Sequence, residues 1–197
     1  MPFTGGLVGA AAYDLVRHFE KLRPRRTNDT PLAAYVAPAS LLVFDHLTRR
    51  VALLHAGSED ERLALRSEVI RALRGAVPAA RARNGFERPR SSLDEPGYVE
   101  AVRHGQENIA AGDVYQLVLS VRFAGGCDID PFEVYRALRL INPSPYMYFL
   151  RLGPCSIVGS SPEALVRLSQ RRAELRPIAG TRSRGANFET DNRLEAE

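Results

Sequence analysis

The hydrophobic positions of the N-terminal half predict strands followed by one long helix. Apolar or β-branched runs predict strands over residues 6–12, 35–45 and 50–56. The last two runs are separated by a short polar turn, which favours an antiparallel hairpin. Apolar residues then recur at helical spacing after Ser58, and they predict a helix that Ser58 caps and that ends near Ala76. A short helix is expected over residues 13–21.

In the C-terminal half, two helix starts combine an acidic residue with a following proline. Asp94-Glu95-Pro96 begins a helix that Gly112 ends, and Asp130-Pro131 begins a second one. Asn142-Pro143-Ser144-Pro145 breaks this second helix, because a proline disfavours helical geometry in the residue before it. Alternating polar and apolar residues predict a strand over 114–123, with Gln116 on its polar face. Further short strands are expected over residues 146–152, 156–159, 163–168 and 173–176.

This order of elements predicts an α+β fold with mainly antiparallel β-sheets and helices packed outside. Residues 77–93 have little periodicity and contain two prolines and several arginines, so we expect a linker or surface connection there. The predicted domains are therefore residues 1–76 and residues 94–197.

Composition excludes several classes of function. The chain has 197 residues, of which 45% are hydrophobic and 25% charged, enough for one sizeable core. Its formal net charge is +4, but the basic residues are spread among acidic ones, so nucleic-acid binding is not expected. No run is long enough to span a membrane, and the N-terminus lacks the features of a signal peptide, so we expect a cytoplasmic protein. Two cysteines and four histidines show no metal-ligand spacing, so a zinc or redox enzyme is not expected, and no metal ligand is assigned.

The segment Arg176-Pro177-Ile178-Ala179-Gly180-Thr181-Arg182 is suited to the wall of an anion pocket. Gly180 lets the backbone come close to a ligand, and Thr181 can donate through its hydroxyl and its amide. Arg182 can hold a carboxylate with its planar fork of donors. The alternative is a strand that ends in an ordinary proline and glycine turn.

Three phrases occur in order along this half: Ala111-Gly112-Asp113-Val114-Tyr115-Gln116-Leu117-Val118-Leu119-Ser120, Ile141-Asn142-Pro143-Ser144-Pro145-Tyr146-Met147-Tyr148, and Ile157-Val158-Gly159-Ser160-Ser161-Pro162-Glu163 leading to the segment 176–182. The set resembles the chorismate-using enzymes and, among them, component I of anthranilate synthase. The opening Pro2-Phe3-Thr4-Gly5-Gly6-Leu7-Val8-Gly9 is also similar to the middle region of that component. The resemblance extends over essentially the whole chain.

The resemblance implies conversion of chorismate and ammonia to anthranilate and pyruvate in tryptophan biosynthesis. It implies Mg²⁺ as the cofactor, and a glutamine amidotransferase subunit as the partner that supplies ammonia. Gly180 and Thr181 match the pair that contacts chorismate. Pro145, Tyr146 and Met147 match the part that contacts the feedback inhibitor tryptophan; the alternative is a turn whose side chains pack into the core.

Two positions distinguish the relatives within this family. Ala179 stands where the similar aminodeoxychorismate synthases carry a lysine nucleophile, and a methyl group cannot form that covalent adduct. Gln116 stands where isochorismate and salicylate synthases carry a lysine that activates water, so it is the candidate catalytic residue. Both positions favour anthranilate synthase, with those relatives as the alternative. Gln116 can also be a strand amide that pairs with the backbone.

The resembling enzymes extend well beyond both ends of this chain. Their metal-binding carboxylates and catalytic histidine match no residue here, and Glu195 and Glu197 are expected to lie at the exposed start of a helix. We therefore expect a fragment of component I that is inactive alone. A non-catalytic fragment that keeps at most part of a ligand site is the other expectation.

Overall fold

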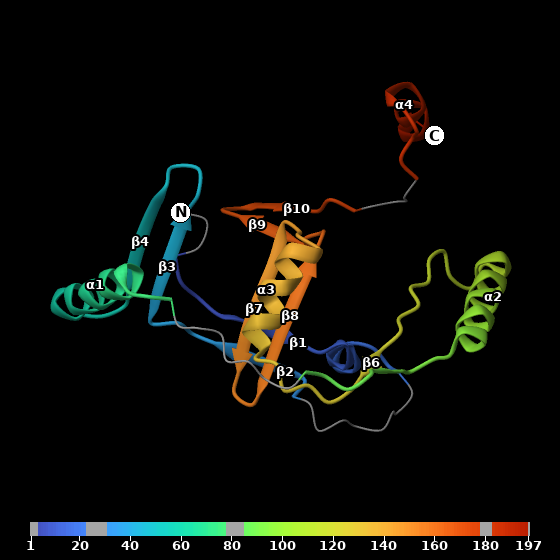
Figure 1. The fold of residues 1–197 in the computed structure, drawn as a ribbon. Helices are drawn as coiled ribbons and strands as arrows, with labels where there is room; N and C mark the ends of the chain where they lie inside the picture. The colour runs from blue at the N-terminus through green and yellow to red at the C-terminus, as the bar shows by residue number, and fades with distance from the viewer. Residues whose placement is uncertain (1–3, 23–30, 78–84, 178–182, 197) are drawn as a thin grey trace. The chain divides into compact units, whose positions relative to one another are not determined.

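The computed structural model describes residues 4–22, 31–77, 85–177 and 183–196. They belong to two compact units, one formed by residues 1–67 with 135–197 and the other by residues 68–134. Figure 1 shows α-helices and short paired strands along the chain. All five sheets of the described residues have two strands, and all are antiparallel. The expected α+β class with antiparallel sheets is confirmed. The linker at 77–93 stays a prediction.

The N-terminal part consists of two strand pairs, a short 3-10 helix and one α-helix. In chain order these are β1 (Val8–Ala11), η1 (Tyr13–His18), β2 (Ala33–Val36), β3 (Ser40–Asp45), β4 (Arg50–His55) and α1 (Glu59–Arg74). β1 pairs with β2, and β3 forms the expected hairpin with β4. The single strand expected over 35–45 is wrong, because Ala37-Pro38-Ala39 separates two strands that pair in different sheets. A proline removes one backbone donor, which suits a break between strands.

Helix α1 begins with a reciprocal capping box. The Ser58 hydroxyl accepts a hydrogen bond from the Glu61 amide at 3.2 Å, and the Glu61 carboxylate accepts bonds from the Ser58 amide and hydroxyl at 2.7 and 2.9 Å. The predicted start at Ser58 is therefore confirmed. The same carboxylate lies 3.7 Å from His55 Nε2, while His55 Nδ1 lies 2.9 Å from the Ser40 hydroxyl. These contacts connect the helix start to the β3–β4 hairpin.

Acidification is expected to weaken this helix start. The hydrogen bonds from Ser58, with a further contribution from His55, lower the pKa of Glu61 from its ordinary value of 4.5. A lowered pKa in the folded state gives stability that is present above pH 4.5 and is lost as the pH falls through the lowered value. Circular dichroism from pH 6 to pH 2.5 should therefore show a larger loss of helix in the wild type than in Glu61→Gln. Glu68→Gln, an exposed change on the same helix, is the control, and identical profiles for Glu61→Gln and the wild type would contradict the role of the capping carboxylate.

The second unit is organised by helix α2 (Glu95–Ala111). The Asp94 side chain caps its first turn by accepting a hydrogen bond from the Gly97 amide at 2.9 Å. Gly112 ends the helix in a left-handed conformation with φ of 82°, which glycine adopts without steric cost. Both predicted helix limits are confirmed. The short strands β5 (Arg90–Ser91) and β6 (Phe123–Ala124) pair with each other.

The strand expected over residues 114–123 is wrong. Only its last residue belongs to a strand, because β6 begins at Phe123. Residues 114–122 have no strand partner among the described residues, and the side chains of Tyr115 and Val118 are 95% and 82% exposed. Alternating apolar residues form a strand only where a neighbouring strand accepts their backbone hydrogen bonds.

The C-terminal part contains a helix on a hairpin, a second small hairpin and a final helix. In chain order these are α3 (Pro131–Ile141), β7 (Tyr146–Leu152), β8 (Cys155–Ser161), β9 (Arg167–Ser169), β10 (Arg172–Glu174) and α4 (Phe188–Ala196). Asp130 caps α3 by accepting a hydrogen bond from the Phe132 amide at 2.8 Å, as predicted. Figure 1 shows α3 lying across β7 and β8, where the rings of Tyr135 and Phe149 have centroids 6.1 Å apart.

The β7–β8 hairpin needs a glycine on its second strand. Gly159 pairs with Tyr148, and a Cβ atom at Gly159 would lie 2.2 Å from the Tyr148 ring. The tyrosine ring therefore lies over the backbone of β8, which fixes how the two strands face each other.

Among the described residues, no hydrophobic side chain is buried. Leu140 and Ile141 at the end of α3 are 86% and 81% exposed, and Leu165 after β8 is 89% exposed. Large apolar side chains in this number are normally covered in a folded protein. Each unit thus carries apolar faces without a covering layer. None of the described helices combines the length and the apolar character that crossing a membrane would require.

Candidate functional site

The register of the β7–β8 hairpin brings two proline-containing segments together. Tyr146 at the start of β7 pairs with Ser161 at the end of β8. Pro145 precedes the first of these residues and Pro162 follows the second, so both prolines stand at the same end of the hairpin. The Ser160 hydroxyl donates a hydrogen bond of 2.6 Å to the Asn142 carbonyl, which fixes the end of α3 to the same place.

A local turn positions the acidic residue that follows Pro162. The Ser161 hydroxyl donates to the Glu163 carbonyl at 2.9 Å and lies 3.4 Å from the Glu163 amide. Serine hydroxyls commonly stabilise such turns by bonding to the backbone two residues on. The turn places Glu163 beside Arg176, the second residue after the end of β10.

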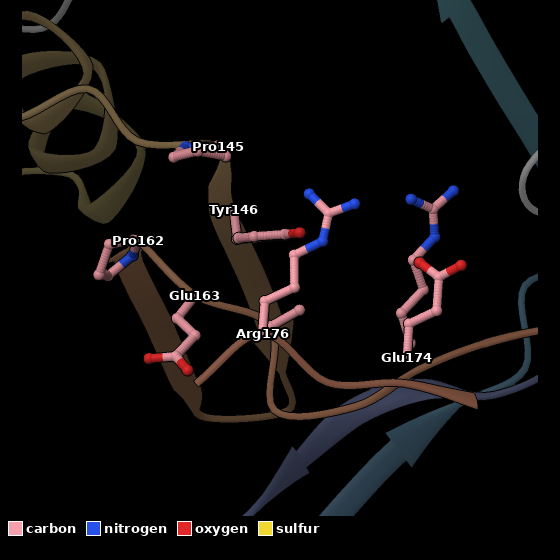
Figure 2. A pocket seen from close by; sticks show the side chains of 8 residues that line it. Pro145, Tyr146, Pro162, Glu163, Glu174 and Arg176 are labelled. Atoms are coloured by element: carbon pink, nitrogen blue, oxygen red, sulfur yellow. The ribbon is translucent and has the colours of Figure 1, made fainter. Parts of the chain in front are cut away.

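The first cavity at this end of the hairpin has a volume of about 300 Å³, and we name it the Tyr146 cavity. Its lining combines prolines, an aromatic ring and four charged side chains: Pro145, Tyr146, Pro162, Glu163, Ala164, Arg167, Glu174 and Arg176. Figure 2 shows the Arg176 guanidinium extending on the side of Tyr146, whereas the Glu163 carboxylate points away from it. The volume lies at the lower end of the range for small-molecule sites.

The charges in the Tyr146 cavity are not neutralised by one another. Glu174 lies 3.5 Å from Arg172 outside the cavity. Neither Arg167 nor Arg176 has an ion-pair partner within the part of the chain that the structure describes, and the Glu163 carboxylate likewise has none. A guanidinium offers a planar fork that matches a carboxylate, and a carboxylate accepts bonds from an ammonium group. With Tyr146, these groups suit a zwitterionic amino acid that carries an aromatic side chain.

A second cavity, of about 420 Å³, lies against the same two segments, and we name it the Pro177 cavity. Its lining residues are Ser161, Pro162, Glu163, Leu165, Leu175, Arg176 and Pro177. Pro162, Glu163 and Arg176 therefore line both cavities. The rest of its lining is more apolar than that of the Tyr146 cavity, and Arg176 is its only cation among the described residues.

The structure brings together some of the residues that the sequence singled out. Pro145 and Tyr146 line one cavity. Met147 is half-buried and is not among the lining residues, because consecutive strand residues point to opposite faces of a sheet. Gln116 is exposed in the other unit. Gly180 and Thr181 lie outside the described residues, as does Ala179.

Three charged residues of the site received no role from the sequence alone. Glu163, Arg167 and Glu174 line the Tyr146 cavity, although only the first stands in one of the phrases quoted above. One sequence feature could have indicated the site: a charged residue stands next to a proline at the end of a predicted strand, in Pro162-Glu163 and again in Arg176-Pro177. Arg167 and Glu174 depend on the β9–β10 register, in which they are paired. Sequence spacing does not reveal that pairing.

The described residues do not fit the implied Mg²⁺. No three histidine, cysteine, aspartate or glutamate side chains gather there in a way that could hold a metal ion. Mg²⁺ needs oxygen ligands in near-octahedral geometry. Glu195 is exposed on α4, and Glu197 lies outside the described residues. We therefore assign no metal ligand in this chain.

Comparison with known proteins identifies the family. The family profile described as chorismate binding enzyme matches residues 2–197. The chain belongs to the chorismate binding enzyme family. Its resemblance to that family in the quoted phrases is thus confirmed over the whole chain.

Two similar proteins of known family membership are anthranilate synthase components. The chain is 43% identical over 201 residues to anthranilate synthase component 1 of Thermus thermophilus, covering 100% of this chain and 44% of that protein. It is 41% identical over 216 residues to the component 1 of Streptomyces coelicolor, covering 100% of this chain and 42% of that protein. The chain therefore spans less than half the length of these relatives.

A solved structure supports the fold of this chain. The crystal structure of anthranilate synthase component I from Streptococcus pneumoniae TIGR4 superposes with a TM-score of 0.71 at 29% sequence identity. The match covers 86% of this chain and 41% of that one. The similarity thus extends to the fold as well as the sequence.

Proposed function

We propose that this chain is part of an anthranilate synthase component I. The complete protein would convert chorismate and ammonia to anthranilate and pyruvate in the cytoplasm, as a step of tryptophan biosynthesis. The observation that carries the proposal is the 43% identity to a component 1 over the full chain, together with the three ordered phrases. The alternative assignment, to aminodeoxychorismate or isochorismate and salicylate synthases, is disfavoured by Ala179 and Gln116.

Chorismate would be contacted by Gly180 and Thr181, which follow the Pro177 cavity in the chain. Chorismate carries two carboxylates, and each needs a cation or hydrogen-bond donors when it is bound. Arg176 is the described cation nearest in sequence to these two residues. Mg²⁺ would be held by residues of the complete protein other than those described here, and a glutamine amidotransferase subunit would supply the ammonia. Gln116 remains the candidate catalytic residue of this chain.

Tryptophan would bind in the Tyr146 cavity as feedback inhibitor. The Tyr146 ring and Pro145 offer an apolar wall to an indole, and Arg167 or Arg176 offers a guanidinium to the α-carboxylate. Glu163 offers a carboxylate to the α-ammonium group. Met147 follows Tyr146 on β7, so its side chain lies on the opposite face of the strand. It would support the site by packing there and not by touching the ligand.

A second candidate function is that of a non-catalytic fragment with part of a ligand site. The specific observation in its favour is the absence of buried hydrophobic side chains among the described residues. Such a chain would bind ligands weakly and associate through its apolar faces.

The isolated 197-residue chain should produce no anthranilate. The expected reason is that its described residues hold no Mg²⁺ ligands, so the negative charge that develops during elimination is not stabilised. The measurement is anthranilate fluorescence with chorismate, ammonium and Mg²⁺, with the complete Thermus thermophilus component 1 as positive control. Turnover by the purified chain would disprove its inactivity, whereas chorismate binding without turnover agrees with the proposal.

Replacing Tyr146 by alanine should weaken tryptophan binding at least tenfold. Loss of a buried aromatic contact costs about 1.5–3 kcal/mol, and each 1.4 kcal/mol is a factor of about ten in affinity. Tyr98→Ala is the control, because Tyr98 is also partly exposed, at 39%, but stands on α2 and lines neither cavity. Titration calorimetry measures both variants. An equal loss of affinity in both would show that the cavity assignment is wrong.

A further inference from the structure

The His55 imidazole lies between the β3–β4 hairpin and the start of α1, and its side chain is only 15% exposed. Its Nδ1 atom lies 2.9 Å from the hydroxyl of Ser40, the residue opposite it on β3. Its Nε2 atom is buried, has no hydrogen-bond partner among the described residues and lies 3.7 Å from the Glu61 carboxylate. The ring is thus bonded to the hairpin and only close to the helix.

Two features hold the Glu61 carboxylate near His55 Nε2 without a hydrogen bond. The nearest carboxylate oxygen, Oε2, already accepts two hydrogen bonds, from the amide and the hydroxyl of Ser58. Gly57 lies against both groups, and a Cβ atom there would stand 2.4 Å from Nε2 and 2.6 Å from Oε2. The missing side chain at residue 57 therefore lets the imidazole and the carboxylate face each other.

Protonation of His55 changes the charge of this contact without requiring a new geometry. A carboxylate only accepts hydrogen bonds, so the neutral ring is assigned with its proton on Nε2 and with the Ser40 hydroxyl donating to Nδ1. A proton from solvent then binds Nδ1, and the Ser40 hydroxyl changes from donor to acceptor. Each nitrogen keeps its neighbour, and the ring gains a positive charge beside Glu61.

No second charge interferes with this pair in the part of the chain that the structure describes. Glu61 is the only charged side chain there within ion-pair distance of His55. His55 also borders a cavity of about 450 Å³, whose other lining residues, at 4–7, 37–39, 41, 54 and 56, are all uncharged. Charges that are partly removed from water are screened less than exposed ones. The state of His55 therefore decides the attraction between ring and carboxylate.

We propose that His55 and Glu61 form a proton-controlled latch between the β3–β4 hairpin and α1. The latch closes when His55 is charged and Glu61 is ionised. The charged ring gains an attraction that the neutral ring lacks, so this stability is present at low pH and is lost as the pH rises through the imidazole range, about pH 5 to 8. Protonation of Glu61 in stronger acid opens the latch again.

The position of α1 gives the latch a consequence for the whole chain. Residues up to Ser67 belong to the first compact unit and residues from Glu68 to the second, so the chain passes from one unit to the other within this helix. The latch thus controls one attachment of the segment that connects the two units. It involves none of the residues that line the Tyr146 cavity or the Pro177 cavity, and it does not rest on the proposed function.

Helix α2 contains a matched pair that should not act as a latch. His104 Nδ1 lies 3.6 Å from the Glu107 carboxylate, almost the separation found between His55 and Glu61. The side chains of this pair are 74% and 68% exposed, and they stand three residues apart on the same helix. Water screens such an exposed pair, and the pair connects no two elements. It therefore serves as the control for pH effects of a histidine and a carboxylate in general.

Amide hydrogen exchange of the 197-residue chain tests the latch at about pH 5.5 and about pH 8.0. The measured quantity is the protection of the Glu61 and Arg62 amides, which donate to Ser58, after correction for the pH dependence of exchange in an unfolded chain. Wild-type protection should be at least about threefold higher at the lower pH. His55→Gln should abolish this difference, whereas His104→Gln should keep it. Glu61→Gln should lower protection at both pH values, because the cap is lost, and should leave no difference between them.

Each contrary result overturns the latch and leaves the proposed function untouched. Equal protection of the wild-type chain at both pH values would contradict it, as would a difference that persists in His55→Gln. Loss of the difference in His104→Gln would assign the effect to general charge. Ser40→Ala keeps the test decisive if His55→Gln reduces the folded content seen by circular dichroism. This variant retains both charged groups but removes the acceptor for Nδ1–H, so the pH difference should shrink, and an unchanged difference would refute protonation at Nδ1.

Discussion

The pairing of Tyr146 with Ser161 is the constraint on which the candidate site depends. This register places Pro145 and Pro162 at one end of the β7–β8 hairpin, and the Ser160 hydroxyl holds the end of α3 to the same point. A slip of one residue would turn Tyr146 to the other face of the strand pair and remove the aromatic wall of the cavity. The close approach of Tyr148 to Gly159 opposes such a slip, because any other residue at 159 would clash with the ring.

The sequence predicts helix starts well and strand partners poorly, for a physical reason. Caps such as Ser58 with Glu61, or Asp94 with Gly97, are local, so the residues that form the hydrogen bonds stand three positions apart. A strand needs a partner that is distant in sequence, and the alternation over 114–123 contains no information about whether one is present. The candidate site shows the same contrast. Tyr146 follows from a family phrase, whereas Arg167 and Glu174 enter the cavity only through the β9–β10 pairing.

The exposed apolar faces agree with the greater length of the relatives. None of the described hydrophobic side chains is buried, and the chain spans 44% of the Thermus thermophilus component 1. Hydrophobic burial is the main favourable contribution to folding, so these faces are where further protein is expected to pack. The proposed activity also depends on this further protein, because the described residues supply one wall of a cavity and no cluster of metal ligands.

The most direct test of this account is a chimera in which the present chain replaces the matched segment of the Thermus thermophilus component 1. The measured quantity is anthranilate fluorescence with chorismate, ammonium and Mg²⁺. We expect the folded chimera to form anthranilate, and Thr181→Val in the same chimera to reduce the rate by removing a hydroxyl donor to chorismate. A chimera that folds and binds Mg²⁺ but forms no anthranilate would contradict the assignment of this chain to an anthranilate synthase component I.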